Sequence, residues 1–313
     1  MALTVSGKTA IVTGAGSGIN LAFAQLLLEN NCNVLFADLT MRQEAQVLVN
    51  KYSQADPTSS AARAAFHRTD VTDWSQLEAM FLAAESAFNT PIDIVCPGAG
   101  VYEPAFSNFW LPPGSEQSFD SPLGSRYASL DINLTHPIRC TQLAIAHFHK
   151  HKRPGVVVHI SSIAAQRPFI ACPLYVAAKS GVSNFVRSLA QLETPPKETG
   201  LAPVRVVAVA PGVIKTPLWT DNPEKLAWVD AERDEWATAE EVAAAMLRLV
   251  QEPEYVGGTV LEVGKEQVRK VEVLNDPGPS GAGHTVSRWT QGYQETWERL
   301  SQDGWGQTLG GKV

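Results

Sequence analysis

The sequence contains few cysteines. Among its 313 residues only Cys32, Cys96, Cys140 and Cys172 are cysteines, and no two of them form a C-x-x-C pair. Zinc sites and disulfide frameworks need closely spaced or paired cysteines, so this spacing suggests neither. We expect these thiols to be reduced and buried among apolar side chains.

Positive charge is also scarce. The chain carries 25 Lys and Arg residues against 32 Asp and Glu residues, which gives a formal net charge of −7. A surface that binds nucleic acid carries an excess of basic side chains. Nucleic acid is therefore not an expected partner.

Long hydrophobic runs are missing as well. No apolar run approaches the roughly 18 residues that a transmembrane helix needs, so no membrane span is expected. Residues Met1–Gly14 lack the basic stretch and apolar segment of a secretion signal. We therefore expect a cytoplasmic protein.

What the sequence does contain is an alternation of short apolar runs with longer helical stretches. Hydrophobic residues make up 44% of the chain, enough for a sizeable core. The runs are nearly continuous, which is typical of parallel strands that helices cover on both faces. Seven strands are predicted: Lys8–Thr13, Asn33–Asp38, Ala64–Asp70, Ile92–Cys96, Gly155–Ser162, Val204–Ala210 and Thr259–Gly264.

These strands predict a single α/β domain over residues 1–265. It is expected to be of the Rossmann type, with a doubly wound, seven-stranded parallel sheet flanked by helices. Residues 266–313 form a C-terminal extension, in which the linker-like segment Asp276–Gly283 precedes an aromatic helix over Ser287–Ser301. Trp289, Tyr293 and Trp297 share one face of that helix, interpreted as an apolar packing face. A lid over the substrate pocket and a contact between subunits are the alternatives.

Two long irregular segments interrupt the regular pattern. The first lid loop, Tyr102–Gly124, is rich in Pro, Ser, Gly and aromatic residues and precedes a predicted helix over Ser125–Lys152. The second lid loop, Pro211–Trp236, precedes a predicted helix over Ala239–Gln251. Long loops in compact domains usually act as lids or interaction surfaces.

A glycine-rich turn connects the first predicted strand to the apolar-periodic stretch Leu21–Leu28. Its sequence is Gly14-Ala15-Gly16-Ser17-Gly18-Ile19-Asn20. Glycines let the backbone approach a pyrophosphate, and a helix start offers free N–H groups and the positive end of its dipole. The turn therefore predicts a dinucleotide site, and a turn without a ligand is the alternative.

Asp38 ends the second predicted strand, 20 residues after Gly18. In dinucleotide-binding domains an acidic residue at this distance hydrogen-bonds the adenosine ribose, and its charge repels a 2′-phosphate. We therefore expect NAD as the cofactor. Arg42 keeps NADP open as an alternative, and Asp38 could instead serve as a helix cap or turn residue.

Tyr175 and Lys179 are four residues apart in a predicted helix, and Tyr175 follows Ser162 by 13 residues. Side chains at this spacing share a helix face, so the ammonium can lie beside the phenol oxygen. A nearby cation lowers the pKa of a tyrosine from its usual value of about 10 and makes the phenol a usable base. The spacing thus predicts an acid–base pair.

With these motifs in this order, residues Gly7–Gly264 resemble the short-chain dehydrogenase/reductase family. Within it, the chain is most similar in general pattern to the NAD-dependent 15-hydroxyprostaglandin dehydrogenase type and its fungal relatives. The matching motifs are the glycine turn, Asp38, Asp70-Val71, Ala99-Gly100, Asn133, Ser162, Tyr175, Lys179 and Pro211-Gly212-Val213-Ile214-Lys215-Thr216.

The resemblance implies a role for each matching residue. Tyr175 is the general acid/base, and Ser162 hydrogen-bonds the substrate oxygen. Lys179 lowers the pKa of Tyr175 and binds the nicotinamide ribose, and Asn133 supports a water that links Lys179 to a proton path. Asp70 and Val71 flank the adenine, and Ile214 and Thr216 position the nicotinamide. The implied cofactor-binding residues are Gly14, Gly16, Ser17, Gly18, Ile19, Asp38, Asp70, Val71, Ala99, Gly100, Tyr175, Lys179, Pro211, Gly212, Ile214 and Thr216.

Two positions depart from the family pattern. Asn20 stands where the family has its third glycine, and we expect it to loosen the packing of helix on strand. Pro97-Gly98 stands where the family has Asn-Asn, and the first asparagine normally ties neighbouring strands together. Since a proline cannot donate a backbone hydrogen bond, we expect altered packing near the cofactor and intact chemistry.

His147, His149 and His151 resemble a metal cluster in the sequence alone. Residues two apart do not share a helix face, so only His147 and His151 could bind a metal together. A solvated helix end is the preferred interpretation, and no metal is expected.

Apolar and aromatic residues in both lid loops favour a bulky, mostly apolar substrate, although packing against the extension is the alternative. We expect an NAD(H)-dependent oxidoreductase that interconverts a secondary alcohol and a ketone and forms a homodimer or homotetramer. An NAD-binding protein that acts as a sensor or scaffold, or catalyses a non-redox step, is the alternative. The lid residues are Tyr102, Phe106, Phe109, Trp110, Leu218, Trp219, Leu226, Trp228 and Trp236.

Overall fold

The structure is a computed structural model in which residues 1–53, 61–226, 229–230, 232–273, 289–302 and 305 are described. It contains one eight-stranded sheet in the order β3-β2-β1-β4-β5-β6-β7-β8. Every neighbouring pair is parallel except β7 and β8. The strands are β1 Thr9–Thr13, β2 Asn33–Asp38, β3 Ala64–Arg68, β4 Ile94–Cys96, β5 Gly155–Ile160, β6 Val204–Pro211, β7 Val260–Gly264 and β8 Gln267–Lys270.

The seven predicted parallel strands are all present, and the eighth strand corrects their number. β8 pairs antiparallel with β7 through a two-residue turn, in which Glu266 adopts a φ of 53°. All four residues of β8 are exposed, so it lacks the continuous apolar run by which the other strands were recognised. The sheet therefore continues to Lys270, and the boundary expected at residue 265 falls inside this hairpin.

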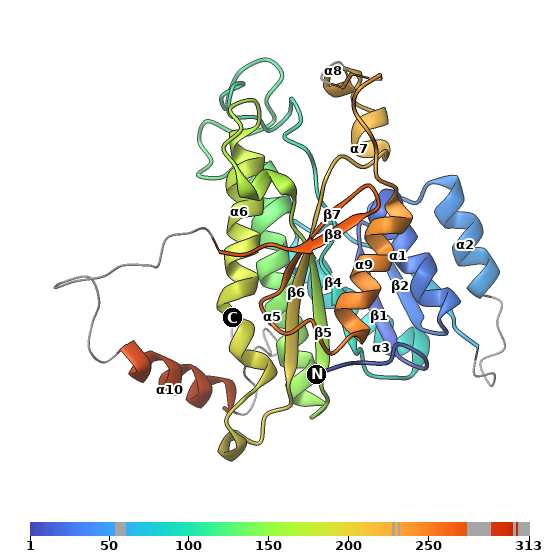
Figure 1. The fold of residues 1–313 in the computed structure, drawn as a ribbon, viewed down its shortest axis with the longest axis vertical. Coiled ribbons are helices and arrows are strands. Elements are labelled where there is room, and N and C mark those ends of the chain that lie inside the picture. Colours follow the sequence, from blue (N-terminus) through green and yellow to red (C-terminus); the bar gives the residue numbers. More distant parts are fainter. Residues whose placement is uncertain (54–60, 227–228, 231, 274–288, 303–304, 306–313) are drawn as a thin grey trace.

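Helices cover both faces of the sheet (Figure 1), with α9 beside α1 on one side and α5 beside α6 on the other. The predicted helix over residues 239–251 is confirmed, whereas the one over 125–152 begins later and is interrupted by a π-helical turn, η1. The helices are α1 Gly18–Glu29, α2 Gln43–Ser53, α3 Trp74–Phe88, α4 Ala128–Leu130, η1 Asp131–Thr135, α5 His136–Lys150, η2 Ile163–Gln166, α6 Pro173–Ser188, η3 Ala190–Glu193, η4 Lys197–Thr199, α7 Pro217–Thr220, α8 Pro223–Leu226, α9 Ala239–Gln251 and α10 Trp289–Leu300. No helix among the described residues is long and apolar enough to cross a membrane.

Strand residues alternate between two hydrophobic cores. In β1, Val12 packs into the core shared with α1 and α9, whereas Ile11 packs into the core shared with α3, α5 and α6. Successive side chains of a strand point to opposite faces, so a sheet covered on both sides needs apolar residues at every position. The four cysteines are unpaired and buried, as predicted.

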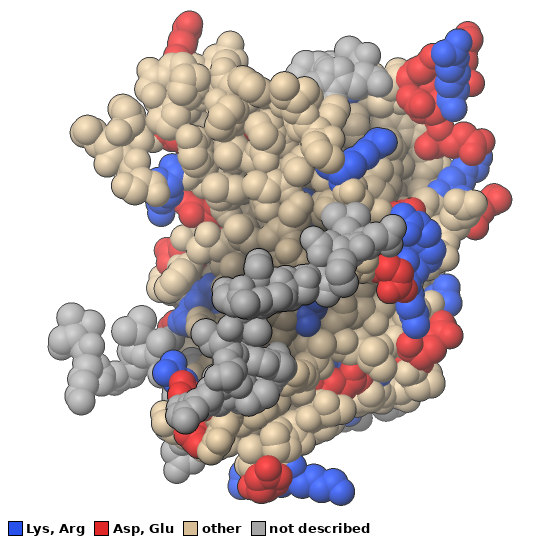
Figure 2. Space-filling model, turned by 60° about the vertical axis from the view of Figure 1, so that its left-hand side comes forward, with Lys and Arg blue, Asp and Glu red and all other residues tan. Residues whose placement is uncertain are grey.

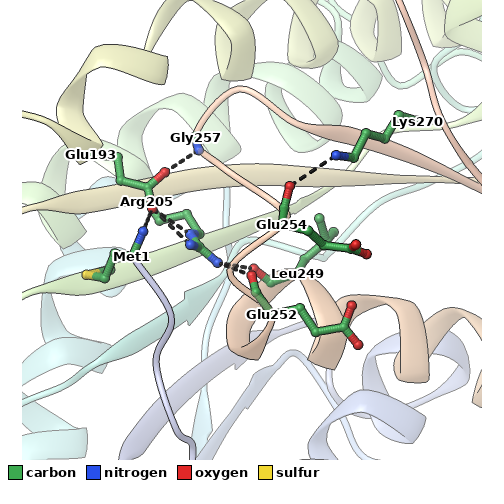
Figure 3. A network of polar contacts seen from close by, with 8 residues as sticks. All are labelled: Met1, Glu193, Arg205, Leu249, Glu252, Glu254, Gly257 and Lys270. Atoms are coloured by element: carbon green, nitrogen blue, oxygen red, sulfur yellow. Dashed lines mark hydrogen bonds and ion pairs between the residues drawn. The ribbon is translucent and has the colours of Figure 1, made fainter.

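A buried arginine reinforces the core at β6 (Figure 3). Arg205 is fully buried, and its Nε donates to Glu193 at 2.9 Å while Nη1 donates to the carbonyls of Leu249 and Glu252 at 3.1 and 3.0 Å. These bonds join η3 and β6 to the end of α9. Because a buried guanidinium is costly without partners, this network compensates its desolvation.

The helix α10 of the C-terminal extension packs against the sheet side of the molecule that carries α3, α5 and α6. Leu300 of α10 is 7% exposed and belongs to the core shared with α3, α5 and α6, against which Trp297 also packs. Figure 1 shows α10 well apart from α7 and α8. These contacts agree with the packing face predicted for Trp297. The linker at 276–283 lies outside the described residues, and so do the side chains of Trp289 and Tyr293.

The strand order reverses between β1 and β4. In doubly wound sheets, ligands bind where the order reverses, beyond the carboxyl ends of the strands. The glycine turn, Asp38, Gly100 and Ser162 all follow or end strands at this edge. The predicted site residues therefore gather at one end of the sheet.

On the face drawn in Figure 2, basic side chains are scattered among acidic ones instead of forming one basic patch.

Candidate active site

A cavity of about 1060 Å³ opens at the carboxyl ends of the strands. It is large enough for a dinucleotide end and a small-molecule substrate together. Of the predicted catalytic and cofactor residues, all but Gly16 and Asn133 line this cavity, and these two form hydrogen bonds with the lining residues Asp38 and Val101. The cavity-lining members are Gly14, Ser17, Gly18, Ile19, Asp38, Asp70, Val71, Ala99, Gly100, Ser162, Tyr175, Lys179, Pro211, Gly212, Ile214 and Thr216.

The glycine turn needs glycine at Gly14 for two reasons. Its φ is 70°, and a Cβ at this position would lie 2.7 Å from Cα of Ala99. Ser17 precedes α1 in an extended conformation and makes no side-chain cap bond. The N–H groups at the start of α1 therefore face the cavity without a side-chain cap, which suits an anionic group such as a pyrophosphate.

Asp38 lies where a ribose-binding acid is expected, at the end of β2. One carboxylate oxygen accepts the Gly16 N–H at 2.8 Å, and the other lies 3.4 Å from the N–H of Thr40. The side chain thus steadies the glycine turn and also faces the cavity. Arg42, the residue that favoured NADP, forms an ion pair with Asp221 of the second lid loop.

The opposite wall of the cofactor region comes from the second lid loop. Thr216 is 7% exposed, and its side chain lies 3.5 Å from the position that a Cβ on Gly18 would occupy. Ile214 is 3% exposed and forms an isolated bridge with Ala237. The two walls therefore approach closely over the glycine turn.

Tyr175 and Lys179 project from α6, one turn apart, as predicted. The Lys179 Nζ lies 5.5 Å from the centre of the Tyr175 ring and donates to the Ile160 carbonyl at 2.8 Å. Ser162 precedes η2, and its Oγ accepts the N–H of Ala164 at 3.1 Å. The phenol of Tyr175 also forms a hydrogen bond with Ser162. Ser162, Tyr175 and Lys179 are thus brought together in one cavity.

The expected lowering of the Tyr175 pKa is not found in this structure. Burial raises the pKa of Tyr175 to about 12, and the hydrogen bond from Ser162 only partly opposes it. Burial also lowers the pKa of Lys179 to about 8. Desolvation disfavours the charged form of both groups, which moves the two pKa values in these opposite directions.

Asn133 lies in the π-helical turn and is 1% exposed. Its side-chain oxygen accepts the Val101 N–H at 2.9 Å, and its Nδ2 donates to the Val101 carbonyl at 2.8 Å. A Cβ on Gly100 would lie 3.0 Å from this oxygen and 3.8 Å from the Lys179 Nζ. Asn133 therefore holds the chain beyond β4 beside Lys179, while its part in a proton path stays a prediction.

The two departures from the family pattern compensate each other. Asn20 is 8% exposed, and a Cβ on Gly98 would lie 2.1 Å from its Oδ1. The Asn20 side chain thus fills the space that a larger residue at position 98 would need. Thr13, at the end of β1, connects this strand to the chain that follows β4. Its Oγ1 accepts the Ala99 N–H at 3.1 Å and lies 3.2 Å from Nε2 of His136.

Sequence reasoning missed Glu103, which is 2% exposed beside the catalytic helix. Its Oε2 accepts the backbone N–H of Tyr175 at 3.0 Å, and its Oε1 accepts that of Phe109 at 3.1 Å. Since Cys172, the residue before α6, makes no side-chain cap bond, Glu103 acts as the acceptor for the start of this helix. A single glutamate in a loop belongs to no motif, so no local signal could identify it.

Only some of the predicted lid residues line the cavity, and Leu226 is not among them. Tyr102, Phe106, Leu218 and Trp219 line the cavity, and Trp236 lies edge-on to Trp219 with ring centres 5.7 Å apart. Phe109 and Trp110 are instead exposed, at 48% and 54%. Trp228 lies outside the described residues. The expectation of an aromatic cavity wall thus holds for part of the predicted set.

Two histidines at the end of α5 and just beyond it approach one acidic residue. Glu85, His147 and His151 have potential ligand atoms within 4.8 Å of one another, and His149 is not among them. His147 was predicted to be solvated, but it is buried in the structure. Its Nε2 accepts the Ile92 N–H at 2.9 Å. The proton of the neutral ring therefore sits on Nδ1, facing Glu85. A metal bound at Nδ1 would require the ring proton to move to Nε2. That nitrogen already accepts the Ile92 N–H and could not also carry a proton. We therefore interpret the cluster as a contact between histidine and carboxylate side chains.

Comparisons with known proteins show which family the chain resembles. Residues 8–227 match the sequence profile of a family described as short chain dehydrogenase. The chain is 30% identical to 15-hydroxyprostaglandin dehydrogenase [NAD(+)] of Rattus norvegicus over 216 residues, which cover 68% of this chain and 71% of the rat protein. It is 31% identical to cis-4-hydroxycyclohexanecarboxylate dehydrogenase of Sinomonas cyclohexanicum over 82% of this chain and 94% of that protein.

A solved structure supports the fold. The chain superimposes with a TM-score of 0.66 on a short-chain type dehydrogenase/reductase from Mycobacterium marinum, covering 83% of this chain and 95% of that one. The sequence identity is 21%. This likeness supports the α/β architecture described above and carries no information on the substrate.

Proposed function

The chain belongs to the short-chain dehydrogenase/reductase family, and we propose that it is an NAD-dependent dehydrogenase that interconverts a secondary alcohol and a ketone. The observation that carries the proposal is the meeting of Ser162, Tyr175 and Lys179 in the cavity that the glycine turn and Asp38 also line. An enzyme of this family acts on a hydroxyl group of a small molecule.

The residues present fit a dinucleotide. The glycine turn lets a pyrophosphate approach the start of α1, and Asp38 can receive ribose hydroxyls. NAD bound there would supply the hydride acceptor. The chain itself supplies binding, orientation and a path for the proton.

Proton transfer falls to Tyr175. In alcohol oxidation its phenolate would take the hydroxyl proton, while Ser162 donates a hydrogen bond to the substrate oxygen. Lys179, held on the Ile160 carbonyl, places a positive charge beside the ring and favours the phenolate. Each step uses a group already within the cavity.

The choice of NAD over NADP rests on Asp38 and Arg42. The Asp38 carboxylate lies at the end of β2, where it would repel a 2′-phosphate. The Arg42 guanidinium, which could attract such a phosphate, is directed to Asp221. Both features support NAD.

A bulky, mostly apolar substrate is supported by the cavity wall. Tyr102, Phe106 and Trp219 line the same cavity as Tyr175, and the Tyr102 and Tyr175 ring centres are 4.7 Å apart. Burial of apolar surface favours such a substrate by roughly 25 cal/mol per Å². Relatives named for a prostaglandin and for a hydroxycyclohexane ring agree with it. An NAD-binding protein without redox activity stays the alternative, and the meeting of Ser162, Tyr175 and Lys179 in one cavity favours the dehydrogenase.

Titration with NADH and NADPH, followed by nucleotide fluorescence, tests the cofactor, and a panel of ring-containing secondary alcohols tests the activity. We expect preferential binding of NADH and turnover of at least one bulky alcohol. Tight NADH binding with no turnover across the panel would contradict the dehydrogenase, and preferential NADPH binding would contradict the choice of NAD.

A further inference from the structure

The second lid loop reaches the cofactor region of the cavity through both ends of the short helix α7. Thr216, the residue before α7, places its side chain 3.5 Å from the position that a Cβ on Gly18 would occupy. Asp221, the residue after α7, forms an ion pair with Arg42. Thr216, Asp221 and Arg42 all line the cavity, and Figure 1 shows α7 on the side of the molecule that carries α1 and α2. The ion pair therefore joins the second lid loop to the segment between β2 and α2.

Arg42 is held at its backbone beside the proposed ribose-binding acid. Its N–H donates to the Gly16 carbonyl at 3.2 Å, and the Gly16 N–H donates to the Asp38 carboxylate at 2.8 Å. Both residues are thus bound to the same peptide of the glycine turn. Because Asp38 is proposed to receive the ribose hydroxyls, Arg42 is a cation within reach of a phosphate on that ribose.

The Arg42 side chain is engaged by the lid instead. Its guanidinium donates to the Asp221 carboxylate, and the two side chains are 47% and 50% exposed. An ion pair with this exposure contributes little to stability, so its partner can be exchanged at small cost. A guanidinium binds carboxylates and phosphates through the same N–H donors. Asp221 and a 2′-phosphate would therefore compete for Arg42.

We propose that Asp221 is a positioning residue that determines cofactor specificity, because it engages the Arg42 guanidinium from the lid and denies it to the 2′-phosphate of NADP. The inference rests on the proposed choice of NAD. Asp38 repels the phosphate by its own charge, whereas Asp221 acts through Arg42. Discrimination between the two nucleotides thus depends in part on the loop whose aromatic residues also line the cavity.

The ratio of the NADPH and NADH dissociation constants tests the inference without turnover. It is measured by fluorescence titration at low salt, because salt screens exposed ion pairs. Asp221→Asn releases Arg42 and should lower this ratio by about threefold to tenfold, between the effect of an exposed ion pair and that of a hydrogen bond to a charged group. Asp221→Glu retains the carboxylate and should retain most of the ratio.

A double-mutant cycle with Arg42→Met shows whether Asp221 acts through Arg42. In the Arg42→Met background no guanidinium is left to release, so Asp221→Asn should change the ratio by less than about twofold. A shift of the same size in both backgrounds would overturn the inference, because the Asp221 charge would then act on the nucleotide directly. An unchanged ratio in Asp221→Asn alone would overturn it as well.

Glu235 offers a matched control for the general field of the protein. It belongs to the same lid loop and lines the same cavity, but its carboxylate pairs with Lys265 at 2.8 Å. Glu235→Gln removes the same charge and should leave the ratio unchanged, and a shift equal to that of Asp221→Asn would count against the inference. Because the readout is a ratio, a change in the lid that weakens both nucleotides does not imitate the expected result.

Turnover of secondary alcohols separates the inference from the proposed reaction. If Asp221→Asn shifts the ratio as expected and no alcohol in the panel is oxidised, the inference is supported and the proposed dehydrogenase is contradicted. If an alcohol is oxidised with NAD and the ratio does not shift, the proposed reaction is supported and the inference is overturned. The two ideas can therefore fail separately.

Discussion

The proton transfer proposed for this cavity depends on single side chains of α6. Tyr175→Phe removes the hydroxyl and retains the ring that packs edge-on against Tyr102. We expect the rate of alcohol oxidation to fall by about 10²-fold to 10⁴-fold, the usual contribution of a general base. Affinity for NADH, measured by fluorescence titration, should change little. Turnover close to that of the unaltered protein would rule out Tyr175 as the base.

Lys179 leads to a pH-dependent prediction. Burial lowers its pKa to about 8, so the ammonium is fully present well below pH 8 and is lost as the pH rises through that value. Only the charged form favours the Tyr175 phenolate, whose pKa burial raises to about 12. In Lys179→Met, oxidation should therefore be slowed most below pH 8, and the deficit should shrink above it.

The measurement is kcat/KM for alcohol oxidation between pH 6 and 10, for both proteins. Both profiles should rise with pH, since the base must be ionised. If the ratio of kcat/KM between the unaltered protein and Lys179→Met stays constant across this pH range, Lys179 acts through binding alone.

At the scale of elements, the contact between α1 and the chain beyond β4 depends on a pair of residues. Asn20 occupies the space beside Gly98, and a Cβ there would approach its Oδ1 to 2.1 Å. Gly98→Ala should therefore lower the free energy of unfolding by about 1–3 kcal/mol through overpacking. In an Asn20→Gly background, the same substitution should cost at least about 1 kcal/mol less, because the opposing side chain is gone.

Chemical denaturation of the four proteins in this double-mutant cycle measures the coupling. Asn20→Gly alone should also destabilise, since glycine in a helix costs about 1 kcal/mol and the contact is lost. Additive effects of the two substitutions would show that Asn20 and Gly98 do not share this space.

At the scale of the whole molecule, the C-terminal helix supports the core away from the cavity. Leu300 is 7% exposed and packs in the core shared with α3, α5 and α6. Leu300→Ala should lower the free energy of unfolding by about 2–5 kcal/mol, the usual cost of this change in a core. NADH affinity at 25 °C should be unaffected, and a marked loss of affinity would place α10 at the active site.

The elements with local signals were predicted from the sequence. The seven parallel strands, the glycine turn and the Tyr175–Lys179 spacing depend on residues close in the chain, so hydrophobic pattern and helix geometry identify them. β8 has no such signal, because an exposed edge strand next to a tight turn needs no apolar run. The π-helical turn at Asn133 was missed for a related reason, since its extra residue leaves the helical pattern almost unchanged.

The sequence by itself determined the chemistry of the site, because a strand, a glycine turn and a helix placed in order bring their own reactive groups to one edge of a sheet. Only the tertiary structure decided how those groups are held and shielded. Glu103 reaches Tyr175 across 72 residues, and Lys225 reaches Glu103 across 122. Burial of Tyr175 also reverses the direction expected for its pKa. Such long-range contacts depend on the paths of the two lid loops, and desolvation depends on everything packed around a group, so no local pattern encodes either.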